Sequence, residues 1–234
     1  MSAPASASIS ASSTTSGKRV VTEGNPLRRV RRRSDFSSQT VVLVDAGGTN
    51  IGSVRYALQR LGVDAVLTAD AATIRAADKV ILPGVGAASP GMARLRELRL
   101  VELMRSLTQP VLGVCLGMQL LCAHSEEGDI ECLGLIPAPV RRFVEAPGLR
   151  VPHMGWNQLV VQQPHPLLAG LGEDDQAYFV HSYAVPVSEW SLATSDYGGA
   201  FSAVIARDNF HGMQFHPERS AAIGAKLLQN FLAL

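Results

Sequence analysis

The residues of this 234-residue chain best suited to covalent chemistry are a cysteine between two glycines and a histidine followed by proline and glutamate. Cys115 lies in Gly-Val-Cys-Leu-Gly-Met-Gln, residues 113–119, directly after a predicted buried strand and directly before a predicted helix. Such an elbow strains its central residue and exposes the side chain, and the flanking glycines leave room for the tight turn. A helix N-terminus lowers the pKa of a thiol and offers N–H groups to an oxyanion. Cys115 is therefore predicted to be a nucleophile.

A nucleophilic thiol needs a base, and the base needs a group that orients it. Of six histidines, only His216 has a carboxylate in a forced geometry, in Gln-Phe-His-Pro-Glu at residues 214–218. The proline favours an extended conformation at His216, and residues i and i+2 of an extended chain point the same way. Glu218 should therefore lie beside the imidazole. Alone, the triplet indicates only a surface turn, but with the elbow it predicts a triad of Cys115, His216 and Glu218.

The other two cysteines, Cys122 and Cys132, are predicted to be buried structural thiols. Three cysteines are too few and too odd in number for a disulfide framework, which favours a reducing, cytoplasmic compartment. The histidines and cysteines lack the spacing of metal ligands, so we predict no metal and no cofactor.

Two glycine-rich segments follow predicted strands. Leu-Pro-Gly-Val-Gly-Ala, residues 82–87, lies where parallel sheets bind ligands, and its glycines would let a peptide N–H turn toward an oxyanion. A simple strand-to-helix turn is the alternative for this segment. Asp-Ala-Gly-Gly-Thr-Asn, residues 45–50, lacks the spacing of a dinucleotide fingerprint and the lysine of a P-loop, so phosphate binding is rejected.

The elements that must position these residues alternate between strands and helices from residue 40 onward. Strands are predicted at Val41–Asp45, Ala65–Thr68, Lys79–Leu82 and Pro110–Val114, with helices at Gly52–Leu61, Pro90–Leu107 and Gly117–His124. This alternation predicts an α/β fold with a mostly parallel central sheet flanked by helices. Antiparallel additions are predicted from Val151–Val161, Ala177–Val185, Leu192–Asp196, Ala203–Ala206 and Gly212–Phe215, before a final helix at Ser220–Leu234.

Composition and charge limit the class of protein. With 47% hydrophobic and 18% charged residues the chain can form a sizeable core, and its longest nearly apolar run, Val111–Ala123, is too short to span a membrane. Residues 1–36 carry seven basic and two acidic side chains, so the remainder has a net charge of −4, which argues against nucleic acid as the main partner. Residues 1–38 are predicted to be a disordered or mis-assigned N-terminal extension, with a transit peptide as the alternative, and residues 39–234 one domain.

Taken together, these motifs resemble the class I (triad) glutamine amidotransferases, over roughly residues 40–234. More narrowly, the chain resembles the glutaminase subunit of imidazole glycerol phosphate synthase, an enzyme of histidine biosynthesis. That narrower likeness rests on Pro83–Gly86, His153–Asn157 and Tyr178–Tyr183. Ala46 and Thr49 stand where this family varies, and residues 1–36 lie outside its pattern.

The resemblance implies a flavodoxin-like fold and hydrolysis of glutamine to glutamate and ammonia through a thioester on Cys115. The implied oxyanion donors are Val85 and Leu116, and the implied glutamine-binding residues are Gly84, Gly86, Gln119, His181 and Ser182. Ammonia would pass to a (β/α)8-barrel cyclase, the partner in a heterodimer, which makes imidazole glycerol phosphate and aminoimidazole carboxamide ribonucleotide. The residues implied to face or gate that cyclase are Asn50, Trp156, Asn157, Tyr178 and Arg219.

Three other functions compete with this interpretation. A stand-alone cysteine hydrolase of related fold would need no partner, but it leaves His153–Asn157 unexplained. A non-catalytic scaffold would have no need of a complete triad. An amidotransferase of another pathway would differ only in the acceptor protein that it binds.

Overall fold

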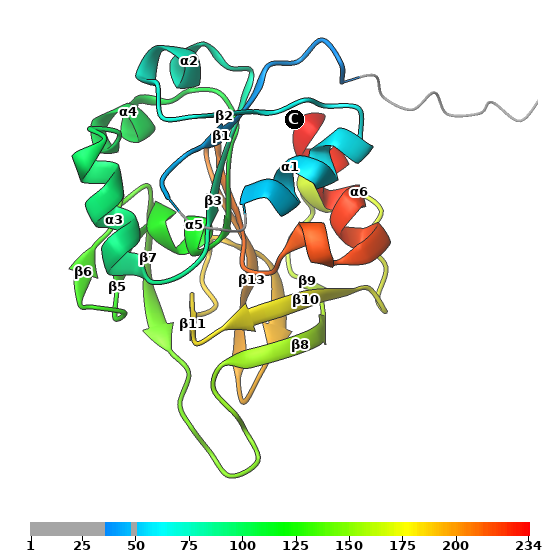
Figure 1. Cartoon of the computed structure of the whole chain (residues 1–234). Coiled ribbons are helices and arrows are strands. Elements are labelled where there is room, and N and C mark those ends of the chain that lie inside the picture. Colours follow the sequence, from blue (N-terminus) through cyan, green and yellow to red (C-terminus); the bar gives the residue numbers. More distant parts are fainter. Residues whose placement is uncertain (1–35, 48–50) are drawn as a thin grey trace, which may run out of the picture. The chain divides into compact units, whose positions relative to one another are not determined.

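Short apolar runs form the centre of the fold, an eight-stranded sheet (Figure 1). The structure is a computed structural model that describes residues 36–47 and 51–234. The strand order is β2-β1-β3-β4-β14-β13-β12-β9. The strands are β1 (Val41–Val44), β2 (Val66–Thr68), β3 (Lys79–Gly84), β4 (Val111–Cys115), β9 (Val160–Val161), β12 (Ser191–Asp196), β13 (Ala200–Arg207) and β14 (Phe210–Met213).

The sheet is parallel in one half and antiparallel in the other, as the sequence predicts, except that β14, predicted among the antiparallel additions, belongs to the parallel half because it pairs with β4. Strands β2, β1, β3, β4 and β14 pair in parallel, whereas β13, β12 and β9 are added antiparallel. Because the parallel strands end at one edge, Cys115 at the end of β4 lies opposite Gly84 at the end of β3. The peptide that follows β14 leaves the sheet beside them. All three motifs with predicted chemistry therefore meet at the carboxyl edge of the sheet.

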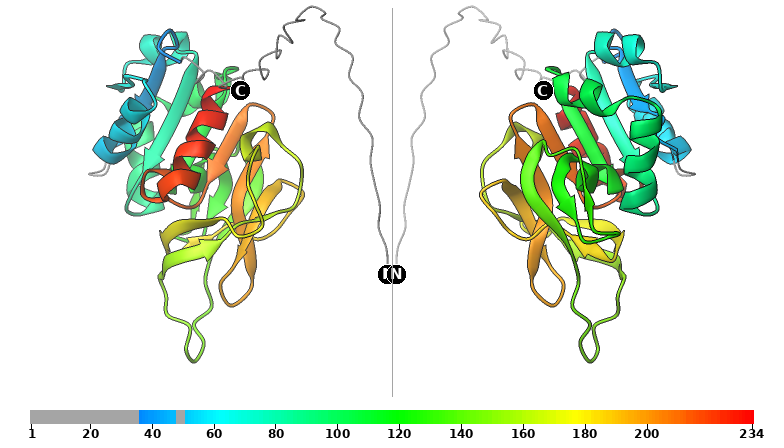
Figure 2. Two further views of the ribbon diagram at one scale, coloured as in Figure 1. Left: turned by 90° about the vertical axis from the view of Figure 1, so that its right-hand side faces the viewer. Right: turned by 90° about the vertical axis from the view of Figure 1, so that its left-hand side faces the viewer.

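Helices cover both faces of the sheet and enclose two hydrophobic cores. One core packs α1 (Ile51–Arg60) and α6 (Ala221–Leu232) on the sheet, and the other packs α3 (Ala88–Glu97), α4 (Val101–Ser106) and α5 (Leu116–Leu121). The two side views in Figure 2 show α6, in red, in front of the sheet in one view and behind it in the other. Phe36 also packs into the α1–α6 core.

Two smaller sheets extend the carboxyl edge. β8 (His153–Gln158) and β10 (Gln176–His181) form an antiparallel pair. β5 (Cys122–Ser125), β6 (Ile130–Glu131), β7 (Ile136–Arg142) and β11 (Tyr183–Ala184) form a four-stranded sheet in the order β11-β7-β5-β6. The remaining elements are α2 (Ala71–Ala76) and the 3-10 turns η1 (Pro166–Leu168) and η2 (Pro217–Arg219).

Several predicted element boundaries are wrong for local reasons. The helix predicted over Pro90–Leu107 is two helices, since the chain turns at Arg99, whose φ is +56°. The helix predicted over Gly117–His124 ends at Leu121 because Cys122 turns extended and pairs with β7. The single strands predicted at Val151–Val161 and Ala177–Val185 are each two strands, broken at Leu159 and Ser182.

One α-helix and three strands are missed by the sequence analysis. α2 begins at Asp70, whose carboxylate accepts a 2.8 Å hydrogen bond from the Thr73 backbone N–H and caps the helix. β7 has the alternating burial of a half-buried strand, but its sequence contains two prolines and so does not look like a strand. β5 and β6 are too short to show a period.

Some predictions concern residues that the structure does not describe. Residues 1–35 of the predicted N-terminal extension and Asn50 are among them. Within the described parts, no helix combines the length and apolar character that crossing a membrane requires.

Candidate active site

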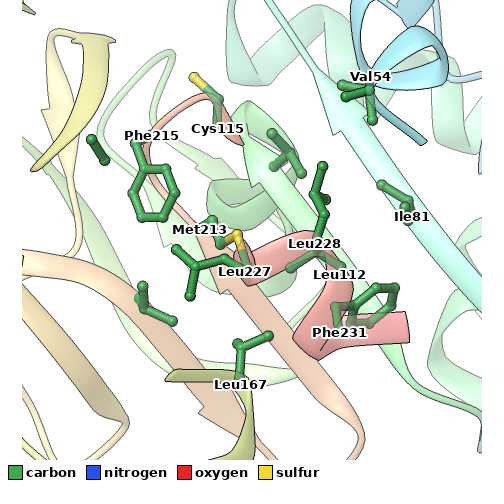
Figure 3. Close-up of a cluster of buried hydrophobic side chains, with 14 of the residues drawn as sticks. Val54, Ile81, Leu112, Cys115, Leu167, Met213, Phe215, Leu227, Leu228 and Phe231 are labelled. Atoms are coloured by element: carbon green, nitrogen blue, oxygen red, sulfur yellow. The ribbon is translucent and has the colours of Figure 1, made fainter. Parts of the chain in front are cut away.

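The elbow at Cys115 has the strained geometry that its sequence predicts. Cys115 has φ +54° and ψ −111°, a conformation that is uncommon for a residue with a side chain. A methyl group added at Gly113 would lie 2.6 Å from the backbone of Gly117, so the turn requires glycine there. Figure 3 shows the Cys115 sulfur directed away from the packed cluster that contains Met213 and Phe215. The strain therefore presents the thiol at the edge of the core.

The Gly84–Val85–Gly86 segment lies against the elbow. A methyl group on Gly84 would approach the backbone nitrogen of Gly117 to 2.7 Å, and Gly86 has φ +95°. Both positions thus require glycine, one for close approach and one for conformation. Val85 and Leu116, whose N–H groups are the predicted oxyanion donors, line one cavity with Cys115.

His216 and Glu218 follow β14 and complete the constellation. The His216 Nδ1 atom lies 2.9 Å from Glu218 Oε1, and both side chains are buried. His216 is extended, as predicted, but Glu218 reaches it from the η2 turn rather than along an extended chain. Ser220 holds this turn, since its hydroxyl donates to the His216 carbonyl and accepts from the Tyr178 N–H.

His216 has an unusual protonation equilibrium. Burial alone would lower its pKa, but hydrogen bonds with the Cys115 thiol and the Glu218 carboxylate outweigh burial and raise the pKa to about 10. A protonated imidazole between a sulfur and a carboxylate can stabilise a thiolate and later donate its proton to a leaving group. This geometry suits a two-step acyl transfer.

A cavity of about 320 Å³ opens in front of the thiol. Its lining includes four of the residues predicted to bind substrate, Gly86, Gln119, His181 and Ser182, together with Glu127. A larger cavity of about 770 Å³ between β9 and η1 is mostly aliphatic and is lined by none of the triad residues. Chemistry rather than size therefore identifies the smaller cavity as the candidate active site.

Comparison with known families agrees with this geometry. The family model described as "Glutamine amidotransferase class-I" matches residues 42–234, which include every strand of the central sheet except the first residue of β1. The chain belongs to the class I glutamine amidotransferases. The enzymatic activity of this family explains why a thiol, an imidazole and a carboxylate lie together at the sheet edge.

Curated relatives in this family are highly similar to the chain. Imidazole glycerol phosphate synthase subunit HisH from Xanthomonas axonopodis pv. citri (strain 306) is 59% identical over 194 residues, which cover 83% of this chain and 97% of the relative. The protein of the same name from Xylella fastidiosa (strain Temecula1) is 56% identical over the same shares of both chains.

Solved structures share the fold at lower identity. A crystal structure of a glutamine amidotransferase superposes with a TM-score of 0.66 at 21% identity, covering 83% of this chain and 97% of that one. The structure of PurLQS from Thermotoga maritima gives a TM-score of 0.63 at 16% identity, with coverage of 83% and 98%. At these identities they support the fold alone.

In this amidotransferase, a chain of hydrogen bonds fixes the predicted substrate residue His181. Its Nδ1 atom lies 2.8 Å from the carbonyl of Tyr183, which can only accept, so Nδ1 carries the proton. Its Nε2 atom therefore accepts from Nδ1 of His153 at 3.4 Å, and His153 Nε2 accepts from Asn157 at 3.4 Å. Both rings are consequently neutral, with the proton on Nδ1. Since protein groups occupy both ring nitrogens of His181, only its backbone is left to meet a ligand.

Three of the residues predicted to face a partner, Trp156, Tyr178 and Arg219, lie together at the outer side of the β8–β10 pair. Trp156 is 51% exposed and meets Tyr178 edge to face with ring centroids 5.9 Å apart. The Arg219 guanidinium lies 4.5 Å from the Tyr178 ring centroid. Asn157, the residue after Trp156 in β8, points to the opposite face of the pair, where it contacts the buried His153 and donates to the Asp196 carbonyl at 2.7 Å. We call Trp156, Tyr178 and Arg219 the aromatic patch.

Glu127 is the cavity residue that sequence reasoning missed. Its Oε2 atom accepts a 2.8 Å hydrogen bond from the Ala88 backbone N–H at the start of α3. One carboxylate in the run Ser-Glu-Glu-Gly-Asp, residues 125–129, has no spacing that distinguishes it from a solvated turn. Glu127 follows Cys115 by 12 residues, and it reaches the cavity because α5 and β5 fold back over the site. The sequence alone does not show this fold.

The buried histidines predict that the amidotransferase loses stability in acid. Burial lowers the pKa of His153 and of His211 to about 4, from 6.5 when exposed. The unfolded chain therefore binds more protons between pH 6.5 and about 4, so the free energy of unfolding falls across that window. We expect each histidine to account for about 1–2 kcal/mol between pH 7 and pH 5.

Urea unfolding at pH 7 and pH 5 measures this effect, and His211→Phe provides the comparison because His211 lies outside the active-site cavity. The variant should lose less free energy of unfolding than the unaltered protein between the two pH values. Equal losses in both proteins would contradict the assignment. His216 has the opposite sign, since its raised pKa gives stability that is complete below pH 6.5 and is lost toward pH 10.

Proposed function

We propose that this chain is the glutaminase subunit of an imidazole glycerol phosphate synthase and supplies ammonia to a cyclase subunit in histidine biosynthesis. One observation supports the chemistry above all others. The Cys115 thiol stands on a strained elbow and lines one cavity with His216, whose imidazole is paired with Glu218, and that cavity can hold a free amino acid. The 59% identity to a curated HisH supports the choice of pathway.

The proposed reaction begins with the Cys115 thiolate. It attacks the carboxamide carbon of glutamine, and the negative charge that develops on the oxygen is stabilised by the N–H groups of Val85 and Leu116. The C–N bond then breaks as His216 gives its proton to the departing ammonia, which leaves a glutamyl thioester. His216 next takes a proton from water, whose oxygen attacks the thioester and releases glutamate and the thiolate. Glu218 keeps the imidazole oriented throughout.

Glutamine binding is proposed to use both charge and backbone. The carboxylate of Glu127 is the acidic group in the cavity lining and would pair with the α-ammonium group of glutamine. Gly84 and Gly86 permit close approach of the backbone, and Gln119 and Ser182 supply polar groups. His181 would contribute through its main chain.

Replacing Glu127 with glutamine tests this arrangement. The amide oxygen of the variant can still accept from the Ala88 N–H, so the fold is kept while the negative charge is removed. We expect the KM for glutamine to rise about 10- to 100-fold with little change in kcat, as for an interaction that is equal in ground and transition states.

The neighbouring Glu126→Gln provides the matched control, because Glu126 is exposed, lies outside the cavity lining and bonds the Arg142 backbone. Steady-state kinetics of both variants decide the matter. An unchanged KM in Glu127→Gln would remove Glu127 from the substrate site.

The aromatic patch is the proposed docking surface for the cyclase, a (β/α)8 barrel, together with Asn50 and Asn157. A large exposed tryptophan supported by a tyrosine and an arginine has the composition of an interface anchor. Residues 39–234 are proposed to form the domain of this glutaminase, with Phe36 packed into its core and the rest of residues 1–38 an extension outside it. The cytoplasm is its proposed compartment.

The deciding experiment measures glutamine hydrolysis by the purified chain alone and with a cognate cyclase subunit plus its nucleotide ligand. We expect a low rate alone and an increase of orders of magnitude with both additions. A rate that does not respond to the cyclase would keep the cysteine chemistry but would exclude this pathway. Tests with acceptor proteins of other pathways would follow.

A further inference from the structure

Gln214 has no part in the reaction proposed above, although it lies against the reacting sulfur. It is fully buried, directly after β14, and its backbone N–H donates to the Ala203 carbonyl at 2.9 Å. Its side chain does not point into an aliphatic core. Instead the Nε2 atom lies 3.9 Å from the Cys115 sulfur, within the range of hydrogen bonds to sulfur, and the Oε1 atom lies 3.0 Å from Gln119 Nε2.

The orientation of the Gln214 amide follows from its neighbours. Gln119 Nε2 lies 2.9 Å from the Tyr183 carbonyl oxygen, an obligate acceptor, so the amide nitrogen of Gln119 must face it. The second N–H of that nitrogen then points at Gln214, which must present its oxygen. The Gln214 nitrogen is thereby turned toward Cys115, and an N–H group rather than a lone pair meets the sulfur.

We propose that Gln214 is a further catalytic residue, which holds an N–H donor against the Cys115 sulfur and stabilises the thiolate. This inference rests on the proposed function only in assuming that the thiolate is the reacting species. A hydrogen bond to an ionised acceptor is about twice as strong as a neutral one, so the N–H favours thiolate over thiol. The hydrogen-bonded amides of Gln119 and Gln214 thus stabilise the thiolate without a second cation beside protonated His216.

The ionisable groups around the sulfur are the ones that could contribute to the pH dependence of Cys115 reactivity. His216, with Glu218 behind it, approaches from the segment after β14, and His181 comes from β10. Glu127 and Tyr183 complete the titratable part of the cavity lining. Among the described residues that line this cavity, none is a lysine or an arginine. Gln214 thus supplies a neutral N–H donor to the sulfur, in addition to the positive charge that a protonated His216 contributes in the same cavity.

Alkylation of Cys115 by iodoacetamide as a function of pH tests the proposal without using glutamine. In Gln214→Met, which keeps the length of the side chain but lacks the N–H, we expect the pH midpoint of alkylation to rise by about one unit. That shift corresponds to a tenfold smaller thiolate-to-thiol ratio. Gln39→Met is the matched control, since it removes a glutamine amide that donates to the Leu232 main-chain carbonyl, far from the cavity.

A merely structural role would lower the melting temperature of Gln214→Met and leave the alkylation midpoint unchanged, and that result would overturn the proposal. Should the variant fail to fold, the unaltered protein with 15N-labelled glutamine gives a second measurement. The side-chain N–H resonance of Gln214 should titrate with the alkylation midpoint and stop titrating in Cys115→Ala. A resonance that ignores the thiol would equally refute the contact. Neither readout depends on whether glutamine is the substrate.

Discussion

Replacing Cys115 with alanine reduces glutamine hydrolysis by at least about 10⁴-fold, because no other group in the cavity can form the thioester. The backbone geometry of the elbow does not need the sulfur, so the variant should remain folded and should still bind the cyclase. Ammonia supplied from solution should then restore the cyclase reaction of the complex. Assays with glutamine and with ammonium salts as nitrogen donor separate the two effects.

Cys132→Ala is the control for that prediction. Cys132 is buried away from the cavity, and burial raises the pKa of its thiol to about 11, so it is almost wholly protonated at neutral pH and a poor nucleophile. The control should retain activity within about twofold. Residual glutaminase activity in Cys115→Ala that Cys132→Ala removes would show that the nucleophile has been misassigned.

Replacing Gly117 with alanine should damage both the fold and the site. The added methyl group would penetrate the carbonyl oxygen of Leu82 on the neighbouring strand, and a backbone carbonyl inside a sheet cannot give way as a flexible side chain can. We expect the free energy of unfolding to fall by about 3–5 kcal/mol. The remaining folded protein should be nearly inactive, since the elbow must move to relieve the overlap.

Gly52→Ala isolates this effect from a general cost of replacing helical glycines. Gly52 is exposed in α1, and its added methyl group would make only an ordinary contact with the Tyr56 ring. The change should raise the free energy of unfolding by up to about 1 kcal/mol through helix propensity. Urea unfolding of both variants provides the comparison, and a Gly117→Ala protein as stable as Gly52→Ala would refute the packing argument.

The triad could be predicted from sequence because each of its constraints is local. Glycines around Cys115 and the proline after His216 act within a few residues, so the sequence near each side chain determines its conformation. Only the meeting of the two segments depends on the fold, and the alternation of strands and helices already places both at the carboxyl edge of one sheet.

The parts that could not be predicted depend on contacts between distant segments. Glu127 enters the cavity because the turn after β5 packs on the start of α3, and Gln214 is oriented by Gln119, 95 residues earlier. α5 ends at Leu121 because β5 finds a partner in β7. Nothing in the local sequence specifies those partners, and an apolar run such as Leu120–Ala123 suits a helix or a strand equally well.

The elbow also connects the two hydrophobic cores, so a mutation in either core can alter the active site. Cys115 packs in the core beneath α1 and α6, whereas Leu116, one peptide bond later, packs in the core beneath α3, α4 and α5. The chain thus passes from one side of the sheet to the other between the nucleophile and the proposed oxyanion donor. Loosening of either layer displaces one of these two residues relative to the other. Directed evolution of this enzyme should therefore find that stabilising substitutions on both sides of the sheet act together on turnover, although they never touch one another or the substrate.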